Sequence, residues 1–174
     1  MQKFTLLCAL VWAAVPNGLG QAAASTKSAD TPLAPVAWFV GGTWVTDVKN
    51  PQSGATTHVD NRITWAPNHQ AIQFVTDFNG TPHYNGFYAY DAAAQAIKFY
   101  YTSETGALSI GTATPDPDGK TLHQDFDITH PNGKTEHFRS TIVRDGDNSY
   151  QFTVLGQQNG EWKPLFQVEY QRKL

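Results

Sequence analysis

Cysteine is almost missing from this sequence. Cys8 is the only one in 174 residues, and it lies in an N-terminal segment that we expect to be removed. Without it, the chain can form no disulfide bond, no thiolate metal site and no cysteine nucleophile. Any chemistry must therefore come from other side chains.

Charge of either sign is also scarce. The 12 Lys and Arg residues are set against 15 Asp and Glu, the formal net charge is −3, and charged residues make up only 16% of the chain. This balance excludes the basic surface of a nucleic-acid-binding protein and a polybasic membrane patch. With 40% hydrophobic residues, the chain is too apolar for wholesale disorder, so we expect a folded domain with no nucleic-acid partner.

Long hydrophobic runs are absent except at the N-terminus. Residues 4–15 are apolar, follow Lys3 and precede the small residues 22–24. A run of this length is too short to span a membrane, which takes about 20 residues. The pattern is typical of a secretory signal peptide at residues 1–24, with a short N-terminal core helix as the alternative. We therefore expect export to the periplasm or the extracellular space and no membrane span.

The remainder is predicted to be one domain behind a short tail. Residues 25–35 are small, polar and contain proline, which is typical of a flexible leader. Residues 36–174 form the predicted domain, and residues 33–40 are predicted to make one helical turn before Gly41 and Gly42.

Helical periodicity is missing from the rest of the chain. Stretches rich in Val, Ile, Thr, Tyr and Phe alternate with turn clusters such as Asn79-Gly80 and Asn159-Gly160, which favour the positive φ angles of tight hairpins. The turns separate ten predicted strands, at residues 42–49, 55–66, 70–79, 82–90, 95–103, 107–114, 119–129, 134–144, 149–158 and 161–173.

Short connections make sequence neighbours antiparallel neighbours in space. An open sheet of ten such strands would leave two long edges, and closure removes both. The sequence therefore predicts an all-β fold, a ten-stranded antiparallel up-and-down β-barrel with a short N-terminal helical turn. A two-sheet sandwich is the alternative, although sandwiches usually need longer crossover links.

Side chains alternate between the two faces of each strand. The polar face carries residues such as Lys98, Asp125 and Arg139. The predicted inward side chains are Trp44, Thr46, Val48, Val59, Ile63, Trp65, Ile72, Phe74, Thr76, Phe78, Ile97, Phe99, Tyr101, Leu108, Ile110, Thr112, Leu122, Gln124, Phe126, Ile128, Phe138, Ser140, Ile142, Tyr150, Phe152, Val154, Trp162, Phe166, Val168 and Tyr170.

The interior of a barrel grows with its number of strands. Ten strands with Thr, Ser and Gly beside the aromatics favour a ligand cavity, and the alternative is that the aromatics fill the interior. The predicted ligand-binding residues are Phe74, Phe87, Phe99, Tyr101, Phe126, Phe138, Phe152 and Phe166. Tyr88, Tyr90, Tyr100 and Tyr101 either line the mouth of the cavity or pack in the wall.

Two short motifs carry a family resemblance. Gly42-Thr43-Trp44 after a helical turn, with Arg172 near the end of the last strand, is similar to the lipocalin and calycin pattern. In that superfamily the Trp plugs one end of the barrel and the Arg packs across its ring, which implies a barrel-closing pair of Trp44 and Arg172.

The wider layout carries a second resemblance. The segments NGFYAYD, GTATPDPDGKTL, GKTEHFRSTI and GEWKPLFQVEYQRK make residues 33–173 similar to a group of bacterial exported proteins with a lipocalin-like domain of unknown function. Ten strands resemble fatty-acid-binding and haem-binding nitrobindin-like barrels more than eight-stranded lipocalins. Nitrobindin-like proteins hold haem through a late-strand histidine. Here none follows His137, so a haem ligand would have to be His123 or His137.

Two polar clusters are candidates for chemistry. His58 and Asp60 share a strand face, as a metal site requires, but an ordinary solvated face has the same pattern. His123, Asp125 and Asp127 lie beside His137 and Arg139 across a predicted hairpin, which gives either a charged outer face or a His/Asp acid–base pair. We expect no metal site and no cofactor.

These observations favour an exported binding protein that holds a small hydrophobic or amphipathic molecule inside the barrel. One alternative is an enzyme on the same barrel, an isomerase, a hydrolase or a haem-type activity, that uses His123 or His137. Another is an interaction module of the cell envelope, with an exposed apolar patch at Tyr84, Tyr88 and Tyr90.

Overall fold

The computed structural model describes residues 31–173. The predicted signal peptide, residues 1–24, and residues 25–30 of the predicted leader lie outside this range. A short 3₁₀ helix, η2 (Ala34–Phe39), comes before ten strands. The strands are β1 (Thr43–Lys49), β2 (Thr56–Trp65), β3 (Ala71–Phe78), β4 (Thr81–Asp91), β5 (Ala96–Ser103), β6 (Leu108–Pro115), β7 (Thr121–Thr129), β8 (Thr135–Arg144), β9 (Ser149–Gln158) and β10 (Glu161–Lys173).

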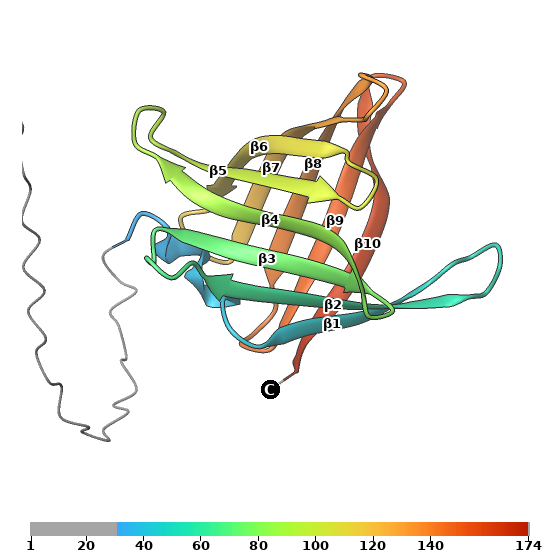
Figure 1. Ribbon diagram of the computed structural model, residues 1–174, viewed down its shortest axis with the longest axis horizontal. Coiled ribbons are helices and arrows are strands. Elements are labelled where there is room, and N and C mark those ends of the chain that lie inside the picture. Colours follow the sequence, from blue (N-terminus) through green and yellow to red (C-terminus); the bar gives the residue numbers. More distant parts are fainter. Residues whose placement is uncertain (1–30, 174) are drawn as a thin grey trace, which may run out of the picture.

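The ten strands form a closed antiparallel barrel in sequence order, as predicted (Figure 1). The last strand returns to the first, with Thr43 opposite Lys173, Trp44 opposite Arg172 and Val45 opposite Gln171. Closure leaves no free sheet edge, so the alternative of a two-sheet sandwich is wrong. Every strand begins and ends within two residues of its predicted bounds.

Turn chemistry explains why the strand positions were predictable. Asn79 and Gly80 both have positive φ, at 50° and 79°, and so do Asn159 and Gly160, at 53° and 82°. Two consecutive residues with positive φ make the turn that best matches the twist of a two-residue hairpin. These turns hold β3 against β4 and β9 against β10.

The helix η2 covers one end of the barrel. Leu33, Val36 and Phe39 are almost completely buried, and the indole Nε1 of Trp44 donates a hydrogen bond of 2.8 Å to the Phe39 carbonyl. The predicted helical turn is therefore present. Because Leu33 is buried, packed structure already begins inside the range 25–35 that was expected to be a flexible leader.

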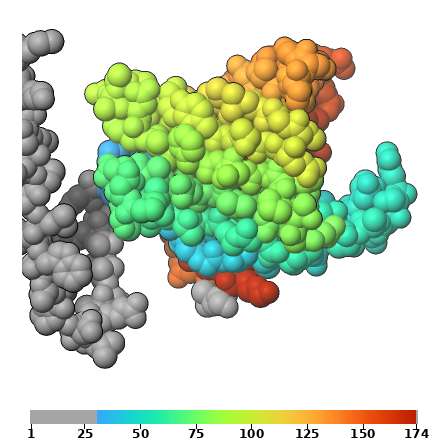
Figure 2. All heavy atoms as spheres, in the orientation of Figure 1, coloured from blue at the N-terminus to red at the C-terminus, as the bar shows by residue number. Residues whose placement is uncertain are grey.

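The opposite end of the barrel is formed by hairpin turns. In Figure 1 the helix lies at the left end, and the β1–β2 turn extends to the right. Figure 2 shows the outer wall as a continuous surface from which the β1–β2 turn projects. The barrel therefore has a closed end, under η2, and an opposite end at the β1–β2, β3–β4, β5–β6, β7–β8 and β9–β10 turns.

The predicted orientation of β6 is wrong. Leu108, Ile110 and Thr112 were expected to point inward, but Ile110 is 44% exposed and Ser109 and Ala113 are buried. The inward face of β6 carries small residues because it lies between strands whose inward side chains are large. Burial of the neighbouring aromatics decides this orientation, and the apolarity of Leu108 and Ile110 does not.

The predicted orientation of Trp162 is also wrong. Its ring lies on the outer face, where the Arg139 guanidinium sits 4.5 Å from the ring centroid and the His137 ring centroid is 5.5 Å away. A β-bulge between Pro164 and Phe166 inserts one residue and reverses the alternation of β10 at this point. Phe166, Val168 and Tyr170, after the bulge, follow the predicted inward pattern.

Candidate ligand cavity

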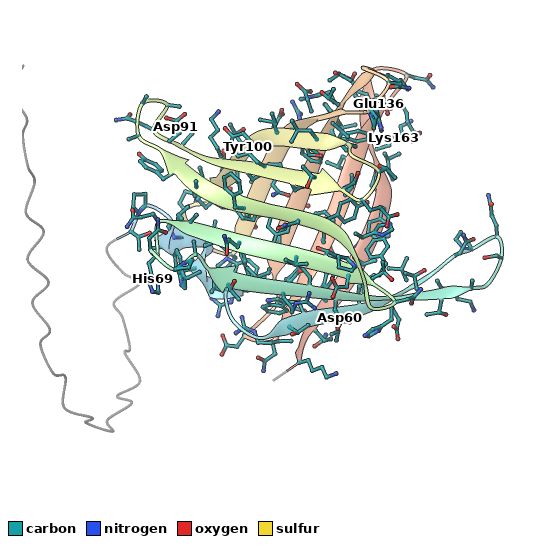
Figure 3. The ribbon with its side chains drawn as sticks, in the orientation of Figure 1. Asp60, His69, Asp91, Tyr100, Glu136 and Lys163 are labelled. Carbon is teal, nitrogen blue, oxygen red and sulfur yellow. The ribbon has the colours of Figure 1, made fainter. Side chains whose placement is uncertain are left out.

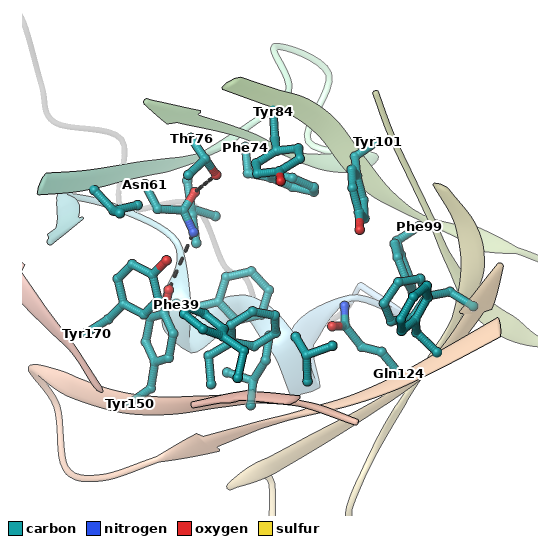
Figure 4. Close-up of a pocket in the computed structure, with 18 of the residues that line it drawn as sticks. Phe39, Asn61, Phe74, Thr76, Tyr84, Phe99, Tyr101, Gln124, Tyr150 and Tyr170 are labelled. Carbon is teal, nitrogen blue, oxygen red and sulfur yellow. Dashed lines mark hydrogen bonds between the residues drawn. The ribbon is translucent and has the colours of Figure 1, made fainter. Parts of the chain in front are cut away.

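The barrel encloses a cavity of about 500 Å³ (Figure 4). Its lining comes from η2, through Phe39, and from most of the barrel strands. Phe166 lines the cavity and is also 38% exposed, so the cavity opens to solvent at the end opposite η2. This volume lies in the range of about 300–1,000 Å³ that small-molecule sites occupy.

Most of the predicted ligand-binding residues lie on the cavity wall. Phe74, Phe99, Tyr101, Phe126, Phe138, Phe152 and Phe166 all line it. Phe87 does not, since it lies on the outer face, is 41% exposed and stacks on Tyr100 with ring centroids 5.2 Å apart. Figure 3 labels Tyr100 on β5. The neighbour of Phe87 in sequence, Tyr88, points inward instead, so Phe87 is corrected to a surface position.

Small residues on two strands keep the wall thin. A Cβ atom added to Gly111 would lie 2.4 Å from the Cβ of Phe126, its register partner on β7. A Cβ atom added to Gly86 would lie 2.5 Å from the Cβ of Tyr101 and 2.6 Å from the ring of Phe74. These glycines give the aromatic side chains room to lie against the wall.

One polar chain is built into the wall, and its members are hydrogen-bonded to one another. The Gln124 amide donates a 2.8 Å hydrogen bond to the Tyr88 hydroxyl, and the Ser140 hydroxyl donates a 2.5 Å hydrogen bond to the Gln124 carbonyl oxygen. All three residues are buried. Burial raises the pKa of Tyr88 far above its ordinary range, so this chain is uncharged at neutral pH.

A second polar chain crosses the barrel. The Thr76 hydroxyl donates to the Asn61 carbonyl oxygen at 3.2 Å, and the Asn61 amide donates to the Tyr150 hydroxyl at 3.4 Å. The Tyr170 ring stacks on Tyr150 with centroids 4.8 Å apart. Figure 4 shows these four side chains gathered at one side of the cavity.

Tyrosines supply most of the remaining polar atoms. Tyr84 and Tyr101 also line the cavity, with ring centroids 5.7 Å apart. Burial raises the pKa of both, and it raises the pKa of Tyr170 to about 12. All three are therefore neutral phenols over the physiological range.

Formal charge is missing from the cavity wall. Among residues 31–173, the lining includes no Asp, Glu, Lys, Arg or His side chain. An ion inside the barrel would lose its hydration without gaining a counter-ion, which is costly. The site is suited to an uncharged or largely apolar molecule.

His123 and His137 both lie on the outer face, which contradicts an interior catalytic or haem site built on them. Their side chains are 50% and 45% exposed. His123 lies 3.2 Å from Asp116, and His137 lies 2.7 Å from Asp127 and 3.2 Å from Asp125. The charged outer face that was the alternative interpretation is what the structure shows.

The structure supports neither a metal site at His58 and Asp60 nor an exposed tyrosine patch on β4. His58 Nδ1 lies 2.7 Å from Asp47 and Nε2 lies 3.6 Å from Asp60, on the outside of the barrel. In the part of the chain that the structure describes, no group of three or more His, Cys, Asp or Glu side chains is arranged to hold a metal ion. Tyr84 and Tyr88 line the cavity, so they cannot form the exposed patch that was considered for an interaction module.

Asn61 lines the cavity but was not among the predicted inward residues. It lies between Val59 and Ile63 on β2 and has the same parity. Tyr84 on β4 also lines the cavity and was not among the predicted ligand-binding residues. The alternation of β2 and β4 was the signal that could have identified both.

The two residues that the resemblance paired, Trp44 and Arg172, are in contact at the closed end. The barrel is compatible with a calycin-like fold. No protein-family model matches the chain, and no curated protein matches it. Within residues 31–173, no helix has the length and hydropathy that crossing a membrane would need.

Proposed function

We propose that this protein is a binding protein of the lipocalin-like type, which holds a small apolar or amphipathic molecule inside its barrel. The observation that carries the proposal is the cavity of about 500 Å³, lined mainly by aromatic and aliphatic side chains and by a few neutral polar groups. Concave, mostly apolar sites with few polar groups are the usual form of small-molecule sites.

Hydrophobic burial supplies the binding free energy. Each methylene group moved from water into such a site contributes about 0.8 kcal/mol, which corresponds to roughly fourfold in affinity. The partly exposed Phe166 marks the entrance, and the helix η2 closes the far end. A ligand therefore enters through the open end and is held by the Phe-rich wall.

Export is the second part of the proposal. It is supported by the apolar run at residues 4–15 and the small residues at 22–24. A mature protein recovered from the periplasm or the medium should begin near Ser25. N-terminal sequencing of the recovered protein tests this, and an intact Met1 on cytoplasmic protein would contradict it.

The binding proposal is tested with the neutral dye Nile red and a pair of matched variants. Val154 lines the cavity, whereas Val143 lies on the outer face and is 37% exposed. We expect saturable fluorescence enhancement with the wild type, loss of at least tenfold in affinity with Val154→Trp, and no change with Val143→Trp. Thermal unfolding checks that both variants fold. Equal dye binding by both folded variants would contradict an interior site.

A further inference from the structure

Within the described part of the chain, two tyrosine hydroxyls on the side of the cavity formed by β2, β3, β4 and β10 make no hydrogen bond to a protein group. Tyr84 on β4 and Tyr170 on β10 both line the cavity. Within residues 31–173, no hydrogen bond joins either hydroxyl to a protein group, whereas Tyr88 and Tyr150 each accept one from an amide. Both hydroxyls are reached from the cavity, so a ligand that displaces water from them has to supply a hydrogen-bond partner in its place.

These two hydroxyls belong to one polar region. Asn61, Thr76 and Tyr84 are successive register partners on β2, β3 and β4, and Tyr170 stacks on Tyr150, which is bonded to Asn61. We call these five residues the polar arc. Figure 4 shows Tyr84 beside Thr76 and Asn61, with Tyr150 and Tyr170 below them. Hydrogen bonds to Thr76 and Tyr150 hold the Asn61 side chain in place. The Tyr84 and Tyr170 hydroxyls of the polar arc remain available as donors to a ligand.

The wall across the barrel from β2 and β3 is mainly apolar, and its one polar member among the described residues, Gln124 on β7, has its amide bonded to Tyr88 and Ser140. The apolar part is formed by Phe126 and Ile128 on β7 and by Phe138 and Ile142 on β8. The cavity is therefore two-sided, with neutral polar atoms on one side and mainly hydrocarbon on the other. A ligand that matches both sides has an apolar body and a localised polar group.

The polar arc favours hydrogen-bond acceptors without charge. Burial is the main cause of the raised pKa of Tyr84 and of Tyr170, so both phenols keep their protons and remain available as donors. No cationic side chain among the described residues lines the cavity. A carboxylate would lose its hydration there without gaining a counter-ion, which is costly. A neutral carbonyl or ester oxygen loses much less, and a hydrogen bond from a phenol compensates for it.

Resting on the binding function proposed above, we propose that the ligand is an uncharged ketone, ester or lactone with an apolar body, whose oxygen atoms accept hydrogen bonds from Tyr84 and Tyr170. The apolar body lies against β7 and β8. The site is thereby selective against fatty acids and other anions of the same chain length.

The test compares three probes of equal carbon number, 2-undecanone, undecane and undecanoate, by displacement of Nile red at pH 8. The variants are Tyr84→Phe and Tyr170→Phe, which remove one hydroxyl each. The control is Tyr100→Phe, on the outer face. Tyrosine-to-phenylalanine changes keep the ring packing, and thermal unfolding confirms that each variant is folded.

We expect Tyr84→Phe and Tyr170→Phe each to weaken 2-undecanone about fivefold, while undecane changes by less than twofold and Tyr100→Phe has no effect. Undecanoate should bind wild type at least tenfold more weakly than the ketone. If undecane displaces the dye but the phenylalanine variants do not distinguish ketone from alkane, the inference fails and the binding function stands. Undecanoate binding as tightly as the ketone would also overturn it. If neither Nile red nor any probe binds, both proposals fail together.

Discussion

The guanidinium carbon of Arg172 lies 4.3 Å from the centroid of the Trp44 ring, directly across the β1–β10 junction that closes the barrel. Arg172 Nη2 also donates a 2.7 Å hydrogen bond to the Trp38 carbonyl, next to the end of η2. Trp44 in turn donates to the Phe39 carbonyl. The two residues therefore join the first strand, the last strand and the helix that covers the closed end.

Replacing Arg172 should weaken this junction. Lysine keeps the charge but loses the flat guanidinium that lies over the indole, so we expect Arg172→Lys to lower the free energy of unfolding by about 1–2 kcal/mol. Arg139, over the Trp162 ring on the outer face, is the matched control because its contact is half-exposed. Chemical denaturation measures both variants, and an equal or larger loss for Arg139→Lys would contradict the role assigned to Arg172.

A methyl group at Gly111 should be poorly tolerated. Its Cβ would lie 2.4 Å from the Cβ of Phe126 and 2.5 Å from the Asp125 carbonyl, and backbone atoms cannot move away cheaply. We expect Gly111→Ala to cost about 2–3 kcal/mol of stability. Thr112→Ala, the next residue on the outer face of β6, should cost less than about 1 kcal/mol. Urea unfolding of the two variants decides this, and similar midpoints would rule out the close approach of Gly111 and Phe126.

Alkaline pH should destabilise the fold through the cavity tyrosines. The folded-state pKa of Tyr170 is raised to about 12, mainly by burial, above the ordinary value of 10. A raised pKa means that the stabilising contribution is complete below pH 10 and is lost as the pH rises from 10 towards 12. The loss from Tyr170 alone is about 3 kcal/mol.

Unfolding free energies measured between pH 8 and 12 test this expectation, with phenolate absorbance followed in parallel. Tyr170→Phe should show a shallower decline than the wild type above pH 10. An identical decline in both proteins would mean that Tyr170 is not held un-ionised by the barrel.

Two phenylalanines of similar exposure should differ in their effect on binding. Phe166 lines the cavity and is 38% exposed, whereas Phe87 lies on the outer face and is 41% exposed. We expect Phe166→Ala to weaken Nile red about fivefold, because apolar contact with the dye is lost. Phe87→Ala should leave the affinity unchanged. A larger loss for Phe87→Ala would locate the dye on the outer face of β4.

The fold was largely predictable because its signals are local. Turn residues such as Asn79-Gly80 and Asn159-Gly160 mark where strands end, and alternation of apolar and polar residues identifies the inward face of strands such as β7 and β8. Closure followed from the short connections. Each of these signals can be read from a few neighbouring residues without knowledge of distant contacts.

The incorrect predictions concern side chains whose surroundings depend on contacts between residues far apart in the sequence. On β6 the small residues Ser109 and Ala113 are inward because large side chains of other strands fill the space, and no local pattern shows this. On β10 the bulge near Pro164 reverses the orientation of Trp162. The polar arc is a third case, since Asn61 and Tyr150 are 89 residues apart and meet only after the barrel closes.

The central claim, that a small molecule occupies the interior, is tested most directly by intermolecular nuclear Overhauser effects between bound 2-undecanone and the methyl groups of the protein. We expect signals to Ile128 and Val154, which line the cavity, and none to Ile110 and Val143, which are exposed on the outer face. Signals confined to Ile110 and Val143, or no contacts at saturating ketone, would contradict an interior binding site.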